Sequence, residues 1–187
     1  MAIPKDLIVI GVVRDARAWA LSMHSKPWHT PRAMQRLPLD TFLRAPWETI
    51  IDRPRYFGDI DPGAIGTPLQ ADRQADGAPY PNLFALRRGK LAGLMSYMAR
   101  GCSFALVRME EAQADPHAFC ARLSSRLGLP ENTAEFRPVV KRLGSKFKAS
   151  VPDRPETPEA LSESQMEFLR TELDVSAERQ LGYDYTA

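Results

Sequence analysis

The sequence predicts an α/β protein in which a parallel sheet is flanked by helices. Two continuous apolar runs, Leu7–Val13 and Phe104–Met109, have the composition of strands buried on both faces. A helical pattern follows each run, and the order strand, helix, irregular segment, helix, strand, helix is typical of alternating α/β domains. Because two strands make a poor sheet, the chain resembles part of a larger α/β domain.

The composition is that of one soluble globular domain spanning residues 1–187. The chain is 44% hydrophobic and 26% charged with a net charge of +2, which gives no support for nucleic-acid binding. No apolar stretch is long enough to span a bilayer and the N-terminus is not a signal peptide, so we expect a cytoplasmic protein that does not bind membranes. Cys102 and Cys120 have neither metal-ligand nor disulfide spacing and are expected to be buried or idle thiols.

The first strand runs directly into a helix that begins at Ala16, with Asp15 placed to cap it. Ligands bind at the carboxyl ends of parallel strands, which is where Arg14 lies. Ser22 lies about two turns along the helix, so the guanidinium, the helix N-terminus and this hydroxyl could together meet a phosphate. The alternative is that Arg14 pairs with a structural carboxylate and Ser22 only packs.

Residues 26–82 form a long irregular excursion rich in Pro, Gly, Asp and Arg. Its prolines leave room for short helices only, one of them over Leu39–Leu43. The rest is expected to be loop, either a functional segment or a variable surface insertion. His24 and His29 have no partner at metal-ligand spacing and are expected to be packed or exposed.

The second half of the chain is more regular. Asn82 caps a helix that Gly101 ends, and one helical face carries apolar residues at Leu83, Leu86, Leu91, Leu94, Met95 and Met98. The second strand follows and ends at Glu110 and Glu111, which could serve as acid or base but more often form ion pairs. Asp115 and Pro116 begin the next helix, and Gly128 ends it.

The sequence of the C-terminal part predicts a basic loop followed by a last helix. The loop carries Gly144 and four basic residues that could close over an anion or simply be solvated: Lys141, Arg142, Lys146 and Lys148. The helix spans 161–182, begins with a capping box of Ser162 and Gln165, and directs an apolar stripe of Met166, Leu169 and Leu173 inward. Neither common phosphate-loop motif occurs in the chain.

Four segments resemble, in order, the nucleotide-dependent sulfotransferases, particularly the bacterial members of that family. The first is VVRDARAWALSMHSKPWH, with an arginine at the strand end and a serine eight residues later. The second is NLFALRRGKLAGLM, and the third is CSFALVRMEEAQADPHAFCARLSSRLGLP. The fourth is LDVSAERQLGY, which is similar to the C-terminal end of many bacterial members. Together they cover most of the chain outside residues 30–80.

The resemblance implies a P-loop-type sulfotransferase fold and a donor nucleotide, 3′-phosphoadenosine 5′-phosphosulfate, with no metal. In that family the arginine and serine of the first segment bind the 3′-phosphate, a role that falls here to Arg14 and Ser22. A basic loop near the C-terminal end closes on the same phosphate, and Lys141, Arg142 and Gly144 stand where it is expected. The acceptor, a hydroxyl or amine compound, and the oligomeric state cannot be predicted from the sequence.

The sequence departs from the family at its start. The family fold begins with a strand and a phosphate-binding loop that holds the 5′-phosphosulfate, whereas Met1 lies only thirteen residues before Arg14. Three explanations are open: the chain is a fragment or has a start placed too late, it is a non-catalytic relative, or another subunit completes its nucleotide site. The lysine of that loop stabilises the charge on the transferring group. Without it, the chain alone is expected to be inactive.

The lead hypothesis is therefore a sulfotransferase-like protein that transfers a sulfuryl group when the missing loop is supplied from upstream or by a partner. The alternative is a non-catalytic binding or interaction protein built on a remnant of the same fold.

Overall fold

The computed structural model describes residues 4, 6–53, 56–58, 60–130, 133–138 and 151–186. Contacts within the chain divide it into two compact units. Unit 1 comprises Met1–Asp15 and Leu91–Ser145, and unit 2 comprises Ala16–Lys90 and Lys146–Ala187. No helix in the described part of the chain has the length and apolar character needed to cross a membrane.

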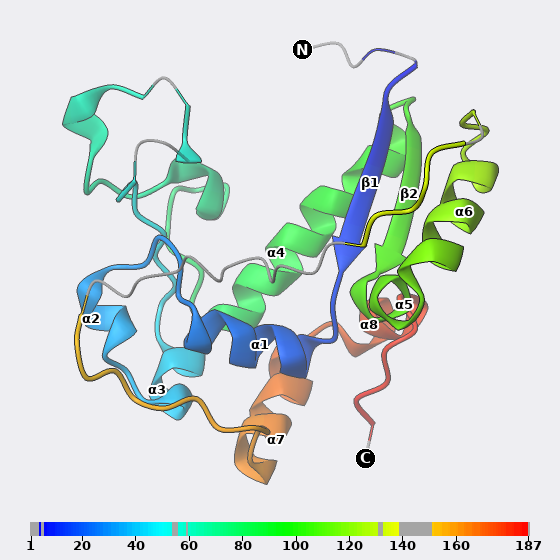
Figure 1. The fold of residues 1–187 in the computed structure, drawn as a ribbon. Coiled ribbons are helices and arrows are strands. Elements are labelled where there is room, and N and C mark those ends of the chain that lie inside the picture. Colours follow the sequence, from blue (N-terminus) through cyan, green and yellow to red (C-terminus); the bar gives the residue numbers. More distant parts are fainter. Residues whose placement is uncertain are drawn as a thin grey trace. The chain divides into compact units, whose positions relative to one another are not determined.

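Unit 1 contains a two-stranded parallel sheet, as predicted. Strand β1 (Ile8–Val13) pairs with β2 (Ser103–Arg108) in a register that runs from Ile8 opposite Ser103 to Val13 opposite Arg108 (Figure 1). Helix α4 (Leu83–Met95) crosses from unit 2 into unit 1, and its last turns cover one face of the sheet. A Cβ at Gly11 would lie 2.9 Å from the Leu94 side chain, so glycine is what permits this close packing.

The other face of β1 differs from the prediction. A strand buried on both faces was expected, but Ile10 is 45% exposed and Val12 is 60% exposed. These residues alternate with Gly11 and Val13, which are buried, so β1 has the one-sided burial of a sheet with a single covered face. Apolar composition alone does not show whether a second layer is present.

Two short helices follow β2 in unit 1. Helix α5 (Met109–Ala114) packs against β2, and α6 (Pro116–Arg126) packs against α5. The side chain of Asp115 accepts a hydrogen bond from Ala118 N and caps α6, as predicted. The prediction that Glu110 and Glu111 end a strand is wrong, because the strand stops at Arg108 and the run of strong helix formers after it forms α5.

Unit 2 holds nearly all of the core. Among the described residues, every buried hydrophobic side chain except Val13 belongs to this unit. Helix α1 (Ala16–Ser25) buries one stripe, Ala16, Ala20 and His24, and packs against α3 (Leu39–Arg44). The short helix predicted over 39–43 is therefore confirmed, as is the capping of α4 by Asn82, whose side chain accepts from Ala85 N at 2.8 Å. Met98, predicted to be on the apolar face, is exposed.

The first half of the predicted excursion is part of this core. Helix α2 (Arg32–Gln35), α3 and the residues after them contribute a set of side chains that are at least 91% buried: Met34, Leu39, Phe42, Leu43, Trp47 and Ile51. These apolar residues are scattered among prolines without a clear period, so the sequence pattern did not identify them as core. The part of the excursion up to residue 51 therefore belongs to the core and is not a surface insertion.

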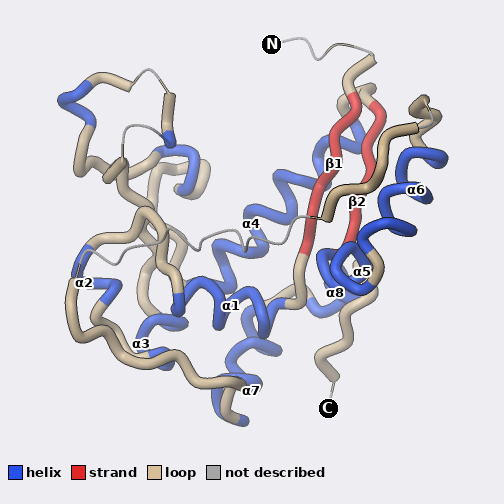
Figure 2. Tube along the Cα trace, viewed as in Figure 1, coloured by secondary structure: helices blue, strands red, loops and turns tan. Residues whose placement is uncertain are grey.

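The second half of the excursion is mostly loop, as predicted, and is held by specific contacts (Figure 2). The single turns of 3₁₀-helix Pro62–Ala64 and Gln70–Asp72 lie in it, and isolated bridges pair Trp47 with Tyr80 and Ile50 with Pro68. The ring of Tyr80 packs so closely on α4 that a Cβ at Gly89 would lie 2.2 Å from its hydroxyl oxygen.

A buried ion pair joins α4 to the C-terminal helices of unit 2. Arg87 donates to both carboxylate oxygens of Glu178, at 2.5 and 2.8 Å, and the two side chains are 5% and 1% exposed. The guanidinium also lies 5.5 Å from the centre of the Trp19 ring of α1. Ala16 N, at the start of α1, donates to the hydroxyl of Tyr185 at 2.8 Å, so the last residues of the chain also secure this helix.

The predicted C-terminal helix is two helices. The capping box of Ser162 and Gln165 begins α7 (Glu163–Glu172), as predicted, and Leu169 and Leu173 are buried. The chain then leaves helical geometry at Leu173, and Asp174 caps α8 (Val175–Gln180) by accepting from Ala177 N. The prediction of one unbroken helix over 161–182 is therefore wrong. Asp174 acts as an N-cap, a position that aspartate favours over a helix interior.

His24 is a packed histidine, as predicted. It is 1% exposed, Nδ1 lies 2.7 Å from Thr157 Oγ1, and Nε2 lies 3.0 Å from the Leu37 carbonyl oxygen. Burial lowers the pKa of His24 below 6.5, the charge of Arg154 lowers it further, and the bond to Leu37 acts in the opposite direction. The Arg154 guanidinium in turn donates to the carbonyls of His24, Ser25 and Gln35, at the C-terminal ends of α1 and α2.

We predict that Leu173→Ala lowers the free energy of unfolding by about 2–5 kcal/mol, because a buried leucine loses its apolar contacts and leaves a cavity. Urea denaturation measures the change. Leu129→Ala, at a leucine that is 42% exposed, is the matched control and should have a small effect. A loss near zero for Leu173→Ala would mean that the α7–α8 junction does not contribute to the core.

Glu178→Gln should destabilise the fold by about 3–5 kcal/mol, because it leaves the Arg87 guanidinium buried without its counter-charge. The double variant Arg87→Met with Glu178→Leu should recover most of this loss, since no buried charge remains. Denaturant titration of the single and double variants measures both. If the double variant were as unstable as the single one, the loss of stability would come from the lost hydrogen bonds and not from the uncompensated charge.

The pKa of His24 predicts how stability depends on pH. Because burial lowers this pKa in the folded state, the unfolded chain binds a proton more readily, and stability falls as the pH drops below about 6.5. Above that pH the contribution of neutral His24 is fully present. Unfolding curves collected across this range should have a slope that His24→Gln reduces, whereas His117→Gln, at an exposed histidine, should leave the slope unchanged.

Candidate functional site

The carboxyl end of the sheet is where the sequence placed a phosphate-binding arginine. β1 ends at Val13, Arg14 is the next residue and α1 begins at Ala16, so Arg14 lies at this end as predicted. Its side chain is half-buried. A guanidinium at this position is partly shielded from water, which strengthens its interaction with an anion.

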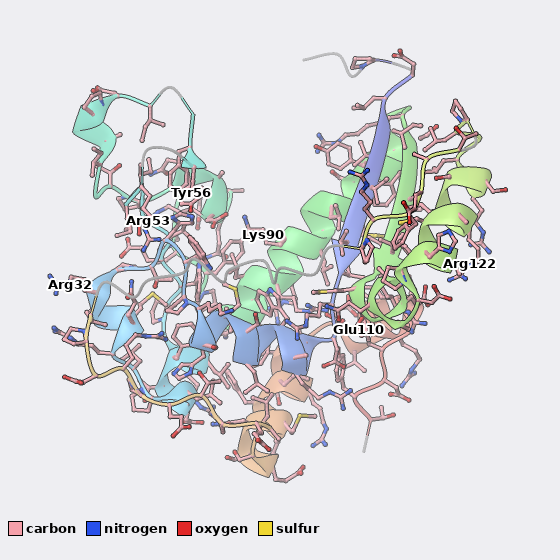
Figure 3. The ribbon with its side chains drawn as sticks, viewed as in Figure 1. Arg32, Arg53, Tyr56, Lys90, Glu110 and Arg122 are labelled. Carbon is pink, nitrogen blue, oxygen red and sulfur yellow. The ribbon has the colours of Figure 1, made fainter. Side chains whose placement is uncertain are left out.

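The turn that carries Arg14 is fixed by the neighbouring connection. Asp15 N donates to Glu110 Oε1 at 2.9 Å, and Glu110 belongs to the first turn of α5, which begins where β2 ends. Figure 3 shows Glu110 at this end of the two strands. In a parallel pair both strands finish at the same edge, so the two connections meet there. A second carboxylate, Glu111, forms an ion pair with Arg108, which confirms the structural role expected for it.

Of the other residues of the predicted nucleotide site, Ser22 belongs to unit 2 and the rest lie outside the described residues. Ser22 lies on α1 with an exposed side chain, and it belongs to unit 2, whereas Arg14 belongs to unit 1. Lys141, Arg142 and Gly144 lie outside the described residues, as do Lys146 and Lys148. The shared role of Arg14 and Ser22 at one phosphate therefore remains a prediction.

A histidine–carboxylate pair in unit 2 was missed by the sequence analysis. His29 Nδ1 lies 2.6 Å from Asp52 Oδ1, and the two side chains are 20% and 21% exposed. His29 also has a positive φ of 59°, a conformation that residues other than glycine adopt infrequently. Its backbone carbonyl accepts a hydrogen bond from Ile50 N at 2.7 Å. The imidazole is therefore held both through its ring and through its backbone.

Aromatic rings surround this pair. The ring centres of Trp28, Tyr56 and Phe57 lie 5.8, 5.4 and 4.9 Å from that of His29. Arg53 places its guanidinium 5.2 Å from the Trp28 ring centre and its Nε 3.6 Å from Asp52 Oδ2. Figure 3 shows Arg53 and Tyr56 together on the loop that follows Asp52. The only sequence signal was the density of aromatic and basic residues in PWH and DRPRYF.

A third feature is an open groove of about 510 Å³ along α6 in unit 1. It is lined by small polar and apolar side chains: His117, Cys120, Ala121, Ser124, Ser125, Leu129, Ala134 and Phe136. The rings of His117 and Phe136 lie 5.0 Å apart across it. Cys120 is exposed and Cys102 is half-buried, and both thiols are free.

Among the described residues, no three His, Cys, Asp or Glu side chains gather as metal ligands. Comparison with known proteins gives no assignment either, because no family model, no curated protein and no solved structure matches this chain.

Proposed function

We propose that this chain is a sulfotransferase-like protein that binds the 3′-phosphate of 3′-phosphoadenosine 5′-phosphosulfate through Arg14. The observation that carries the proposal is the position of Arg14 directly after β1, at the carboxyl end of a parallel strand pair. This edge is the common ligand site of parallel sheets, and the order of segments along the chain resembles that of the sulfotransferases.

The chemistry of Arg14 suits a phosphate dianion. A guanidinium offers two parallel N–H donors to phosphate oxygens and keeps its charge at any physiological pH. The first N–H of the helix that follows, that of Ala16, already donates to the hydroxyl of Tyr185, so the proposal rests on the guanidinium itself. The resemblance adds the hydroxyl of Ser22. In the full reaction, the sulfuryl group would pass from this nucleotide to a hydroxyl or amine of an acceptor.

Glu110 provides an internal test of this site. Its carboxylate accepts from Asp15 N, one residue beyond Arg14, and its negative charge opposes an incoming phosphate. Glu110→Gln keeps an oxygen that can accept the Asp15 hydrogen bond and removes the charge. If a phosphate binds at Arg14, this substitution should strengthen its binding, whereas a purely structural Arg14 gives no reason for such a gain.

We predict that adenosine 3′,5′-bisphosphate binds the chain weakly and more tightly than adenosine 5′-monophosphate, which lacks the 3′ group. Arg14→Ala should cost about 1.5–3 kcal/mol of binding free energy, the usual worth of a hydrogen bond to a charged group. Isothermal titration calorimetry with both nucleotides measures this. Arg122→Ala, at an exposed arginine on α6 in the same unit, is the matched control and should bind as the native chain does.

Equal affinity for the two nucleotides, or an affinity that Arg14→Ala leaves unchanged, would contradict the proposal. The second candidate, a non-catalytic binding protein on the same fold, shares the nucleotide prediction and differs in transfer. Sulfuryl transfer to any acceptor after addition of an upstream segment or partner subunit carrying a phosphate-binding loop would favour the enzyme.

A further inference from the structure

We propose that His29, oriented by Asp52, offers Nε2 as a hydrogen-bond acceptor to a neutral ligand that combines an aromatic ring with a hydroxyl group. The inference rests on residues of unit 2 alone and requires no nucleotide, so it stands or fails separately from the proposed function. It is carried by the tautomer that Asp52 imposes, by the anchoring of the His29 backbone and by the surrounding rings.

Asp52 determines which nitrogen of His29 is available. An ionised carboxylate only accepts hydrogen bonds, so the 2.6 Å contact requires the hydrogen of the neutral ring to be on Nδ1. The lone pair is then on Nε2, which can accept a hydrogen bond from a ligand. In the described part of the chain, Nε2 has no hydrogen-bond partner. Every buried side-chain nitrogen or oxygen there has one, so Nε2 must reach solvent.

The backbone of His29 is held in an unfavourable conformation. A positive φ is strained for a histidine and persists only where the surrounding contacts impose it. Here the hydrogen bond from Ile50 N and the bond to Asp52 hold the residue from two sides. A histidine that only filled space would not need both, whereas a histidine that presents Nε2 in a fixed direction does.

The charges and rings define the kind of ligand. Among the described residues, the charge of Asp52 is offset by that of Arg53, whose guanidinium lies over the Trp28 ring, so this ion pair carries no excess charge. Such a site favours a neutral ligand over an ion. The ring of Tyr56 is 47% exposed beside His29 and offers an apolar surface on which a planar ligand can stack. A hydroxyl on that ligand would donate to Nε2.

The test uses two neutral probes that differ in one hydrogen-bond donor, 4-methylphenol and 4-methylanisole, titrated into the full chain. We expect 4-methylphenol to bind at least tenfold more tightly and to shift the ring resonances of His29. The chain has only two other histidines, which serve as internal references. Both nitrogens of His24 are already hydrogen-bonded, so its resonances should not shift, and a shift confined to His117 would place the probe in the groove along α6 and contradict the proposal.

His29→Asn is the decisive variant, because asparagine tolerates a positive φ and should leave the fold intact. It should abolish the tenfold preference for 4-methylphenol, whereas the matched variant His117→Asn should keep it. Asp52→Asn preserves the size of the side chain but removes the charge, and should reduce the preference only in part. A preference that survives His29→Asn, equal affinity for the two probes, or no binding of 4-methylphenol up to its solubility limit would overturn the proposal.

Discussion

The buried pair of Arg87 and Glu178 is the interaction on which unit 2 depends. It joins two segments that are 91 residues apart, and both partners are withdrawn from water. Burying a charge is tolerated only when its partner is held in good geometry. The helices that carry these residues must therefore be in place together. The same guanidinium lies over Trp19, so α1 is tied to the same point. Most of the core is assembled around it.

Much of the local structure could be predicted, because its cause is local. The caps at Asn82, Asp115 and Ser162 each satisfy backbone N–H groups within three residues, and all three form as the sequence indicates. The two strands were recognisable from their apolar composition, and their parallel pairing from the segments that separate them. The break at Asp174 was missed because apolar periodicity continues across it, although the capping signal was present.

The parts that could not be predicted depend on contacts between distant residues. Nothing near His29 in the sequence indicates Asp52, which lies 23 residues away among prolines. The burial of Trp47 and Phe42 likewise depends on tertiary packing, which no helical or strand periodicity in the sequence predicts. For the candidate site, the place of Arg14 follows from the strand that precedes it. The wider phosphate site stays a prediction, because it draws on Ser22 from unit 2 and on residues outside the described segments.

The contact between Tyr80 and Gly89 has a consequence for how this sequence can diverge. Tyr80 occupies the space that any side chain at position 89 would need, and the conflict involves its ring carbons as well as its hydroxyl, so a phenylalanine would not relieve it. The order of substitution then matters. A small residue at position 80 removes the conflict before position 89 changes, whereas the reverse order passes through an intermediate in which the Tyr80 side chain has to move off α4. The two positions are thus expected to change as a coupled pair, with the first order costing less stability than the second.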